Sequence, residues 1–170
     1  MHRTGRIARA RSGYSSPMNS ETDTPSALDK PSPEHQRPKG VDDATVAAAG
    51  KLSEALECVE RARGHLYSFH QLMGHADLLL GEAVDALSDA GHTDISGRIE
   101  TDMIGRNIAP GRWTFQLVEE FDDEYWSPLR EHDRAVRDEL MDGRRHVFEA
   151  EMKERRRTHG RSGHEARPTD

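Results

Sequence analysis

A long helical pattern occupies the middle of the chain, from Thr45 to Ala90. Apolar residues recur there at alternating spacings of four and three, the period of one face of an α-helix. This face consists of Ala55, Val59, Ala62, Leu66, Phe69, Met73, Ala76, Leu80, Ala83 and Leu87. We call it the apolar seam and expect it to pack against other helices.

Local signals bound this helix. Asp42 or Asp43 can cap its start, because a carboxylate accepts the free N–H groups of a first helical turn, and Gly91 can end it. A helix of this length spans roughly 70 Å, whereas a compact domain of about 110–120 residues has a radius of gyration of only about 13 Å. The helix therefore either breaks at Gly64 or Gly74, or pairs with antiparallel helices in one chain or across a dimer.

Shorter helices are predicted after Gly91. One covers about 95–104, another begins near Trp113, and a last one starts at Pro128 with Ser127 as its cap. Gly143 can interrupt the last helix. No alternating strand pattern occurs. We therefore expect an all-α fold, a bundle or hairpin of about four helices.

Two glycines predict a close helix contact. Gly74 and Gly81 are seven residues apart and share one helix face. Each costs about 1 kcal/mol relative to alanine inside a helix. We expect another helix to approach closely there.

Composition divides the chain into three parts. Residues 1–41 hold five of the eight prolines and many Ser and Thr residues, a composition too polar to form a core. We expect disordered tails at 1–41 and 158–170 around a helical domain at 42–157. Both Met1 and Met18 stay open as translation starts.

Charge and cysteine content limit the partners. The net charge of −7 combines 9 Lys/Arg against 22 Asp/Glu in residues 41–142 with a basic excess at both ends. The middle therefore repels nucleic acid, and only the tails could bind it weakly. A single cysteine excludes an internal disulfide and fits the cytoplasm. No apolar run reaches the roughly 20 residues of a membrane span.

The densest candidate chemistry lies in residues 105–126. Its first half carries the side chains that suit an anion: arginines, an amide and an aromatic ring ahead of a helix. These candidate ligand-binding residues are Arg106, Asn107, Arg112, Trp113 and Gln116. Glu120 and Asp123 follow on one helix face with Gln116. The structural alternative is that the arginines pair with the acidic helix while the aromatics pack.

His70 and Asp77 form a second candidate pair. They lie two turns apart in a polar stripe beside the apolar seam. They could share a group from a neighbouring helix and, with Glu120 and Asp123, supply acid–base chemistry. The alternative is that each bonds to neighbouring backbone or side chains.

The histidines do not form a metal motif. His65, His70 and His75 are spaced by five, which turns them to different faces of a helix, whereas metal-binding helices use spacings of three or four. We expect no metal and no cofactor.

The stretch GRN-x-x-PGRWTFQ-x-VEEFDD-x-YW, followed by GRRHVFEAEMKERRR, resembles a small prokaryotic family of all-helical proteins. The resemblance covers about residues 60–165. It implies a prokaryotic, cytoplasmic origin and carries no known activity, cofactor or ligand residue.

These observations favour a non-enzymatic helical module that binds a protein partner or a small ligand, with a homodimer as one form. The alternatives are an enzyme or anion-binding protein that uses the 105–126 segment, and weak nucleic-acid association through the basic tails.

Overall fold

The computed structural model describes residues 29–167. Five α-helices follow a short 3₁₀ turn (Pro33–His35): α1 (Asp43–Asp89), α2 (Thr93–Met103), α3 (Thr114–Phe121), α4 (Ser127–Leu140) and α5 (Val147–Arg156). A π-helical turn (Asp122–Trp126) joins α3 to α4. Within residues 29–167 the only β pairing is an isolated bridge between Ala109 and Arg112. The all-α prediction is confirmed.

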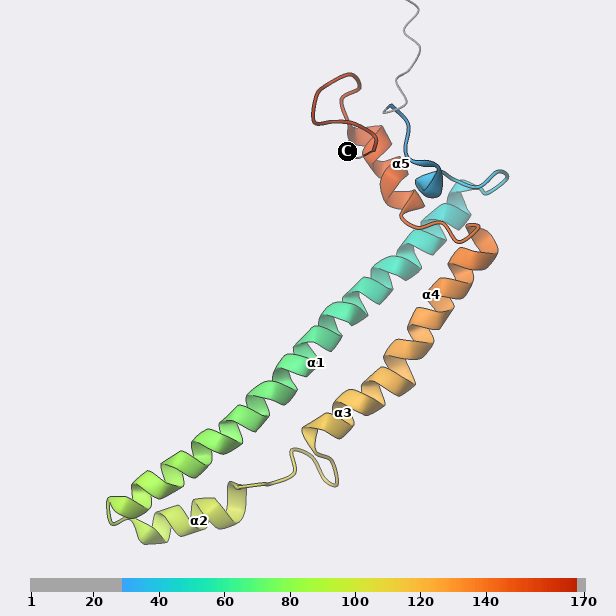
Figure 1. Cartoon of the computed structure of the whole chain (residues 1–170). Coiled ribbons are helices and arrows are strands. Elements are labelled where there is room, and N and C mark those ends of the chain that lie inside the picture. The colour runs from blue at the N-terminus through green and yellow to red at the C-terminus, as the bar shows by residue number, and fades with distance from the viewer. Residues whose placement is uncertain (1–28, 168–170) are drawn as a thin grey trace, which may run out of the picture.

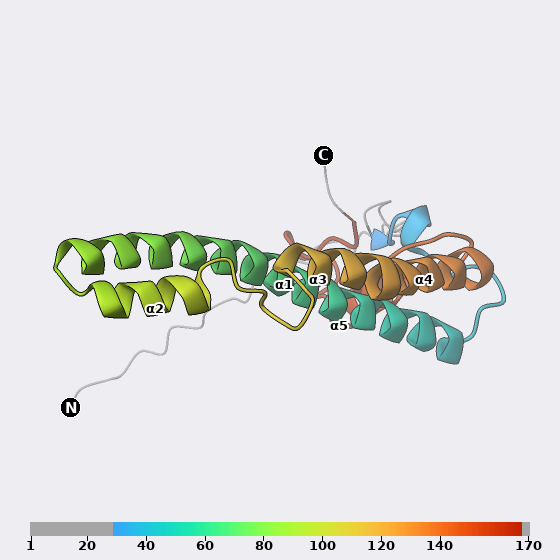
Figure 2. The same cartoon turned by 90° about the horizontal axis from the view of Figure 1, so that it is seen from below.

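The molecule is a long helical hairpin built on α1 (Figure 1). The 47 residues of α1 are one continuous helix, which spans roughly 70 Å. α2 folds back along its far end, and α3 and α4 continue the return beside it (Figure 2). α5 lies against the start of α1. The long helix is thus unbroken and pairs with antiparallel helices of its own chain.

The predicted ends of α1 are correct. The Asp42 carboxylate accepts the Thr45 backbone N–H at 2.7 Å. After Asp89 the chain turns through Gly91, whose φ of +87° is open to glycine without strain.

The predicted cap at Ser127 is wrong. Ser127 is helical, with φ −60° and ψ −49°, and its N–H bonds to the carbonyl of Asp122, five residues back. Pro128 has no N–H and its ring crowds the preceding turn. The wider π-turn accommodates this proline, so α3 and α4 continue as one run.

The buried apolar core lies at the α5 end of the hairpin. It consists of Val46, Ala49, Met141 and Val147, with Val41 and Val136 packed against it. Elsewhere in residues 29–167, Pro38, Val84 and Val118 are also buried.

The apolar seam is covered less than predicted, because none of its ten residues is fully buried. Two antiparallel helices cover only a narrow strip of each other. That strip runs through residues 63, 70, 77 and 84 of α1, so the seam lies along its edge.

The close approach predicted at Gly74 and Gly81 is also wrong within the described chain. A Cβ atom built at either position would meet nothing within 4 Å. The close contact occurs instead at Gly50, where a Cβ would lie 2.9 Å from both Cβ and Cγ of Phe148.

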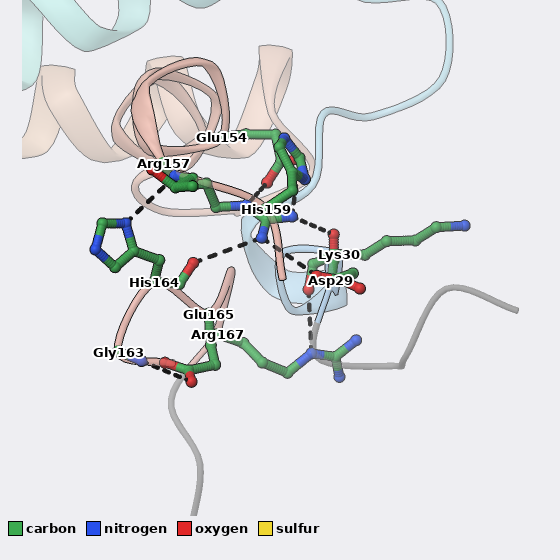
Figure 3. A network of polar contacts seen from close by, with 10 residues as sticks. Asp29, Lys30, Glu154, Arg157, His159, Gly163, His164, Glu165 and Arg167 are labelled. Carbon is green, nitrogen blue, oxygen red and sulfur yellow. Dashed lines mark hydrogen bonds and ion pairs between the residues drawn. The ribbon is translucent and has the colours of Figure 1, made fainter. Parts of the chain in front are cut away.

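Residues 29–41 and 158–167 contact the helices and each other, outside the predicted 42–157 domain. Arg157 joins them (Figure 3). Its side chain is 2 % exposed and pairs with Asp29 at 3.3 Å and with Glu154 at 2.5 Å. Arg37 bonds both carboxylate oxygens of Glu151, at 2.7 and 2.8 Å. The predicted disorder of residues 1–28 and 168–170 lies outside the described residues.

Candidate functional site

Three polar residues of α1, spaced by seven, bind three successive segments of the returning chain. Arg63 binds the π-turn through Asp122 at 2.7 and 2.8 Å. His70 Nδ1 lies 2.7 Å from Thr114 Oγ1 at the start of α3. Asp77 accepts the backbone N–H of Gly105, just after α2, at 2.9 Å. We call these three residues the polar stripe.

These contacts explain why the sequence has polar residues at positions 63, 70 and 77. Residues seven apart fall on nearly the same side of a helix, and this side faces the return run. His70 and Asp77 do not meet at one shared group. Each holds one end of the segment between α2 and α3, as the structural alternative for this pair describes.

The Arg63 site is a compact ionic and aromatic cluster. Tyr67 Oη donates to the same carboxylate, Asp122, at 2.8 Å. The Arg63 guanidinium lies 4.2 Å from the centre of the Trp126 ring, a cation–π distance. Hydrogen bonds from Arg63 and Tyr67 lower the pKa of Asp122, and the bond to Asp122 raises the pKa of Arg63.

A pocket opens where the chain passes from α2 to α3. Residues 104–113 form a loop that stands against α1 between the two anchors, Gly105 and Thr114. The cavity between this loop and α1 measures about 450 Å³. We call it the loop pocket. Its size is within the range of small-molecule sites, which is roughly 300–1,000 Å³.

The wall of the loop pocket is mainly apolar. Met73, Ala76 and Leu80 of α1 form one side, and Met103, Ile108, Trp113 and Phe115 contribute from the returning chain. Trp113 is 59 % exposed and meets Phe115 edge to face with ring centres 5.6 Å apart. Large apolar side chains therefore line a cavity open to solvent.

Four of the predicted site residues line this pocket: Asp77, Arg106, Asn107 and Trp113. Asp77 already accepts the Gly105 N–H. Arg106 donates to the backbone carbonyl of Asp102 at 3.2 Å and forms no ion pair within residues 29–167. His70 reaches the pocket only through Thr114, which is a lining residue.

The remaining candidate residues do not line the loop pocket. Arg112 pairs with Glu120 at 2.9 Å, both about half exposed. Gln116 accepts the backbone N–H of Trp113 at 2.9 Å and so caps α3. Asp123 is exposed and does not line the loop pocket. The structure therefore separates Glu120 and Asp123 from His70 and Asp77 rather than gathering them around one cavity.

Sequence reasoning missed one buried charge. Asp133 is 1 % exposed; it accepts a hydrogen bond from Ser53 Oγ at 2.8 Å and forms an ion pair with Arg137. The i, i+4 spacing of Asp133 and Arg137 was available as a signal. The burial of Asp133 could not be predicted from the sequence, because its partner Ser53 is 80 residues away in the chain.

Two basic clusters lie near the C-terminus, at residues 144–146 and 153–157, and some of their arginines bond inside the fold. Arg144 donates to the Gln36 carbonyl at 2.7 Å, and Arg157 is buried against Asp29 and Glu154. Two carboxylates pair with Arg157, so its guanidinium is not exposed to solvent. Fewer arginine side chains are therefore available to bind nucleic acid than the composition indicates.

Across residues 29–167, no group of three or more His, Cys, Asp or Glu side chains is placed to hold a metal ion. No helix in that range is both long and apolar enough to cross a membrane.

No protein-family model, curated protein sequence or solved structure matches this chain. The similarity of residues 60–165 to a prokaryotic family therefore stays a prediction.

Proposed function

We propose that this protein is a helical binding module that holds a small apolar molecule in the loop pocket. The observation that carries the proposal is the exposed apolar wall. Met103, Ile108, Trp113 and Phe115 are each 37–59 % exposed around one cavity of about 450 Å³. Covering such surface contributes about 25 cal/mol per Å², so a ligand that fills the cavity gains affinity from contacts the chain does not satisfy itself.

The anchoring of the loop supports the proposal. Asp77 and His70 of α1 hold the two ends of the loop, through Gly105 and Thr114 respectively. The cavity therefore exists before a ligand arrives. A preformed site loses less conformational entropy on binding. The polar stripe in this proposal has a positioning role and not an acid–base role.

The test uses a neutral apolar probe, N-phenyl-1-naphthylamine, whose fluorescence rises when it leaves water. Gly74→Leu places a side chain in the pocket from a position that has free space around it. Gly81→Leu is the matched control, since it has equal free space on the same helix and does not line the pocket. We expect Gly74→Leu to weaken probe binding at least tenfold and Gly81→Leu to leave it unchanged. Equal binding by both variants and the parent contradicts the proposal.

A second candidate function is protein partnering, including a homodimer. It is favoured by Phe69, Leu72 and Leu79, which are 38 %, 65 % and 48 % exposed. Spacings of three and seven put them along one side of α1, next to the pocket residues Met73 and Ala76. Exposed contiguous apolar surface of this kind is typical of interaction sites.

Sedimentation velocity tests this candidate. If the side chains mediate self-association, the double variant Leu72→Glu, Leu79→Glu sediments as a monomer at concentrations where the parent does not. Leu78→Glu is the control, because Leu78 is 68 % exposed but lies on another side of α1. A parent protein that is monomeric at every concentration contradicts the homodimer.

A further inference from the structure

We infer that the loop pocket is selective for a small aromatic monoanion, whose charged group binds Arg106 and whose ring packs beside Trp113. This inference rests on the proposed function and specifies the chemical class of its ligand. It comes from the charged side chains that line the cavity, Arg106 and Asp77, because the apolar wall by itself would favour a neutral molecule over a charged one.

Among the described residues, Arg106 differs from Arg63 and Arg112 in having no ion-pair partner. Arg63 is paired with Asp122, and Arg112 with Glu120. Arg106 is the arginine that lines the pocket, and within residues 29–167 it has no carboxylate partner within 4.0 Å. The sequence predicts an anion site with two arginines, Arg106 and Arg112, but of these two only Arg106 lines the pocket.

The donors of Arg106 suit a carboxylate or sulfonate. A guanidinium has five N–H donors, and Nη1 of Arg106 makes one bond, to the Asp102 carbonyl. The remaining donors can bind two oxygens of an anion side by side. The amide of Asn107 lies next in the chain and also lines the pocket.

Asp77 sets the upper limit of the ligand's charge. Its carboxylate lines the same cavity and accepts the Gly105 N–H at 2.9 Å. A second negative charge on the ligand would have no arginine left in the pocket and would be repelled by Asp77. One anionic group is therefore favoured over two.

The aromatic part of the inference comes from Trp113 and Phe115. The two rings meet edge to face with an interplanar angle of 85°, and Trp113 stays 59 % exposed. An aromatic ligand placed against it completes a further ring pair, and ring pairs add to the gain from area burial.

Matched naphthalene compounds test the inference by isothermal titration calorimetry. The three probes are 1-naphthaleneacetate, its neutral amide 1-naphthaleneacetamide, and the cation 2-(1-naphthyl)ethylamine. We expect the acetate to bind about tenfold or more tightly than the amide, which corresponds to one charged hydrogen-bonded contact. Arg106→Gln should remove this preference and leave the affinity for the amide unchanged. Arg112→Gln, in which the exposed Glu120 loses its partner, should keep the preference.

The outcomes separate the two proposals. Equal affinity for acetate and amide, or a preference that survives Arg106→Gln, overturns the anion inference while the binding function stands. Tighter binding of the amine overturns it as well and indicates Asp77 as the recognising group. If none of the three compounds binds and the neutral fluorescent probe also fails, the proposed function itself is wrong.

Discussion

Arg63 and Asp122, 59 residues apart in the chain, form a two-bond ion pair in which both guanidinium–carboxylate distances are under 3 Å. The pair fixes the π-turn to the middle of α1. Its side chains are 28 % and 18 % exposed, so water screens it less than a surface pair. Trp126 and Tyr67 pack against the same guanidinium.

Asp122→Asn should lower the free energy of unfolding at pH 7 by about 1.5–3 kcal/mol, the range for hydrogen bonds to charged groups. The folded-state pKa of Asp122 is below its ordinary value, because Arg63 and Tyr67 donate to the carboxylate. Its contribution is therefore complete above the unfolded pKa of about 3.9 and is lost as the pH falls through the lower folded pKa. Urea unfolding at several pH values measures this, with the parent and variant converging in acid.

Asp123→Asn is the control for this experiment. Asp123 is the exposed neighbour of Asp122, and a surface change of this kind should stay within about 0.5 kcal/mol. An equal loss in both variants would mean that the effect comes from the helical turn and not from Arg63.

The glycines of α1 should respond oppositely to alanine. Gly64→Ala should raise the free energy of unfolding by roughly 1 kcal/mol, because alanine is the better helix former and its Cβ meets nothing within 4 Å. Gly50→Ala should lower it, because the new methyl would overlap Phe148. Thermal unfolding of the two variants gives the comparison, and stabilisation by Gly50→Ala would contradict the packing of α5 on α1.

Asp133→Ala should cost about 3 kcal/mol, since it leaves Arg137 without its partner in a largely buried place. The double variant Asp133→Leu, Arg137→Met should lose less than Asp133→Ala alone, because it removes both charges. Chemical unfolding of the parent, Asp133→Ala and the double variant measures their free energies of unfolding. Glu131→Ala, an exposed change on the same helix, is the reference. A double variant less stable than Asp133→Ala would show that the ion pair contributes net stability.

Arg157→Gln should loosen residues 158–167 while α1 to α4 stay folded, because Arg157 bonds the His164 carbonyl as well as Asp29 and Glu154. Hydrogen exchange followed by mass spectrometry should show faster exchange in 158–167 and unchanged exchange in α1. Arg156→Gln is the matched control, because Arg156 is the exposed neighbour. Unchanged exchange in the Arg157 variant would mean that other contacts hold the segment.

Local chemistry made much of the fold predictable. Asp42 and Gly91 mark the ends of α1 because a cap and a positive-φ turn depend on residues a few positions away. Comparing the length of α1 with the size of a compact domain left two options, a break at Gly64 or Gly74 or pairing with antiparallel helices, and the continuous α1 of the structure excludes the break. Ser127 failed as a cap because the π-turn that accommodates Pro128 is a property of the joined helices.

The site was predictable only in part. Arg106, Asn107 and Trp113 were selected as candidates because a loop rich in arginine and aromatic residues precedes a helix, and all three line the loop pocket. Glu120 and Asp123 were grouped with them through helix spacing, which says which side chains share a face but not which cavity that face meets. The pairing of Asp77 with Gly105, 28 residues apart, depends on how the return run lies against α1.

The polar stripe also determines which alignment of the two long runs is possible. If the return run slid by one heptad toward the α2 end, Asp122 would face His70 and Thr114 would face Asp77, leaving Arg63 without a carboxylate. A slide the other way would put Asp122 against Leu56. A row of identical leucines would pack equally well after such a slide. Arg63, His70 and Asp77 each bind a different partner, so a slide breaks all three contacts. The hairpin thus has one register, and the loop pocket has one position along α1.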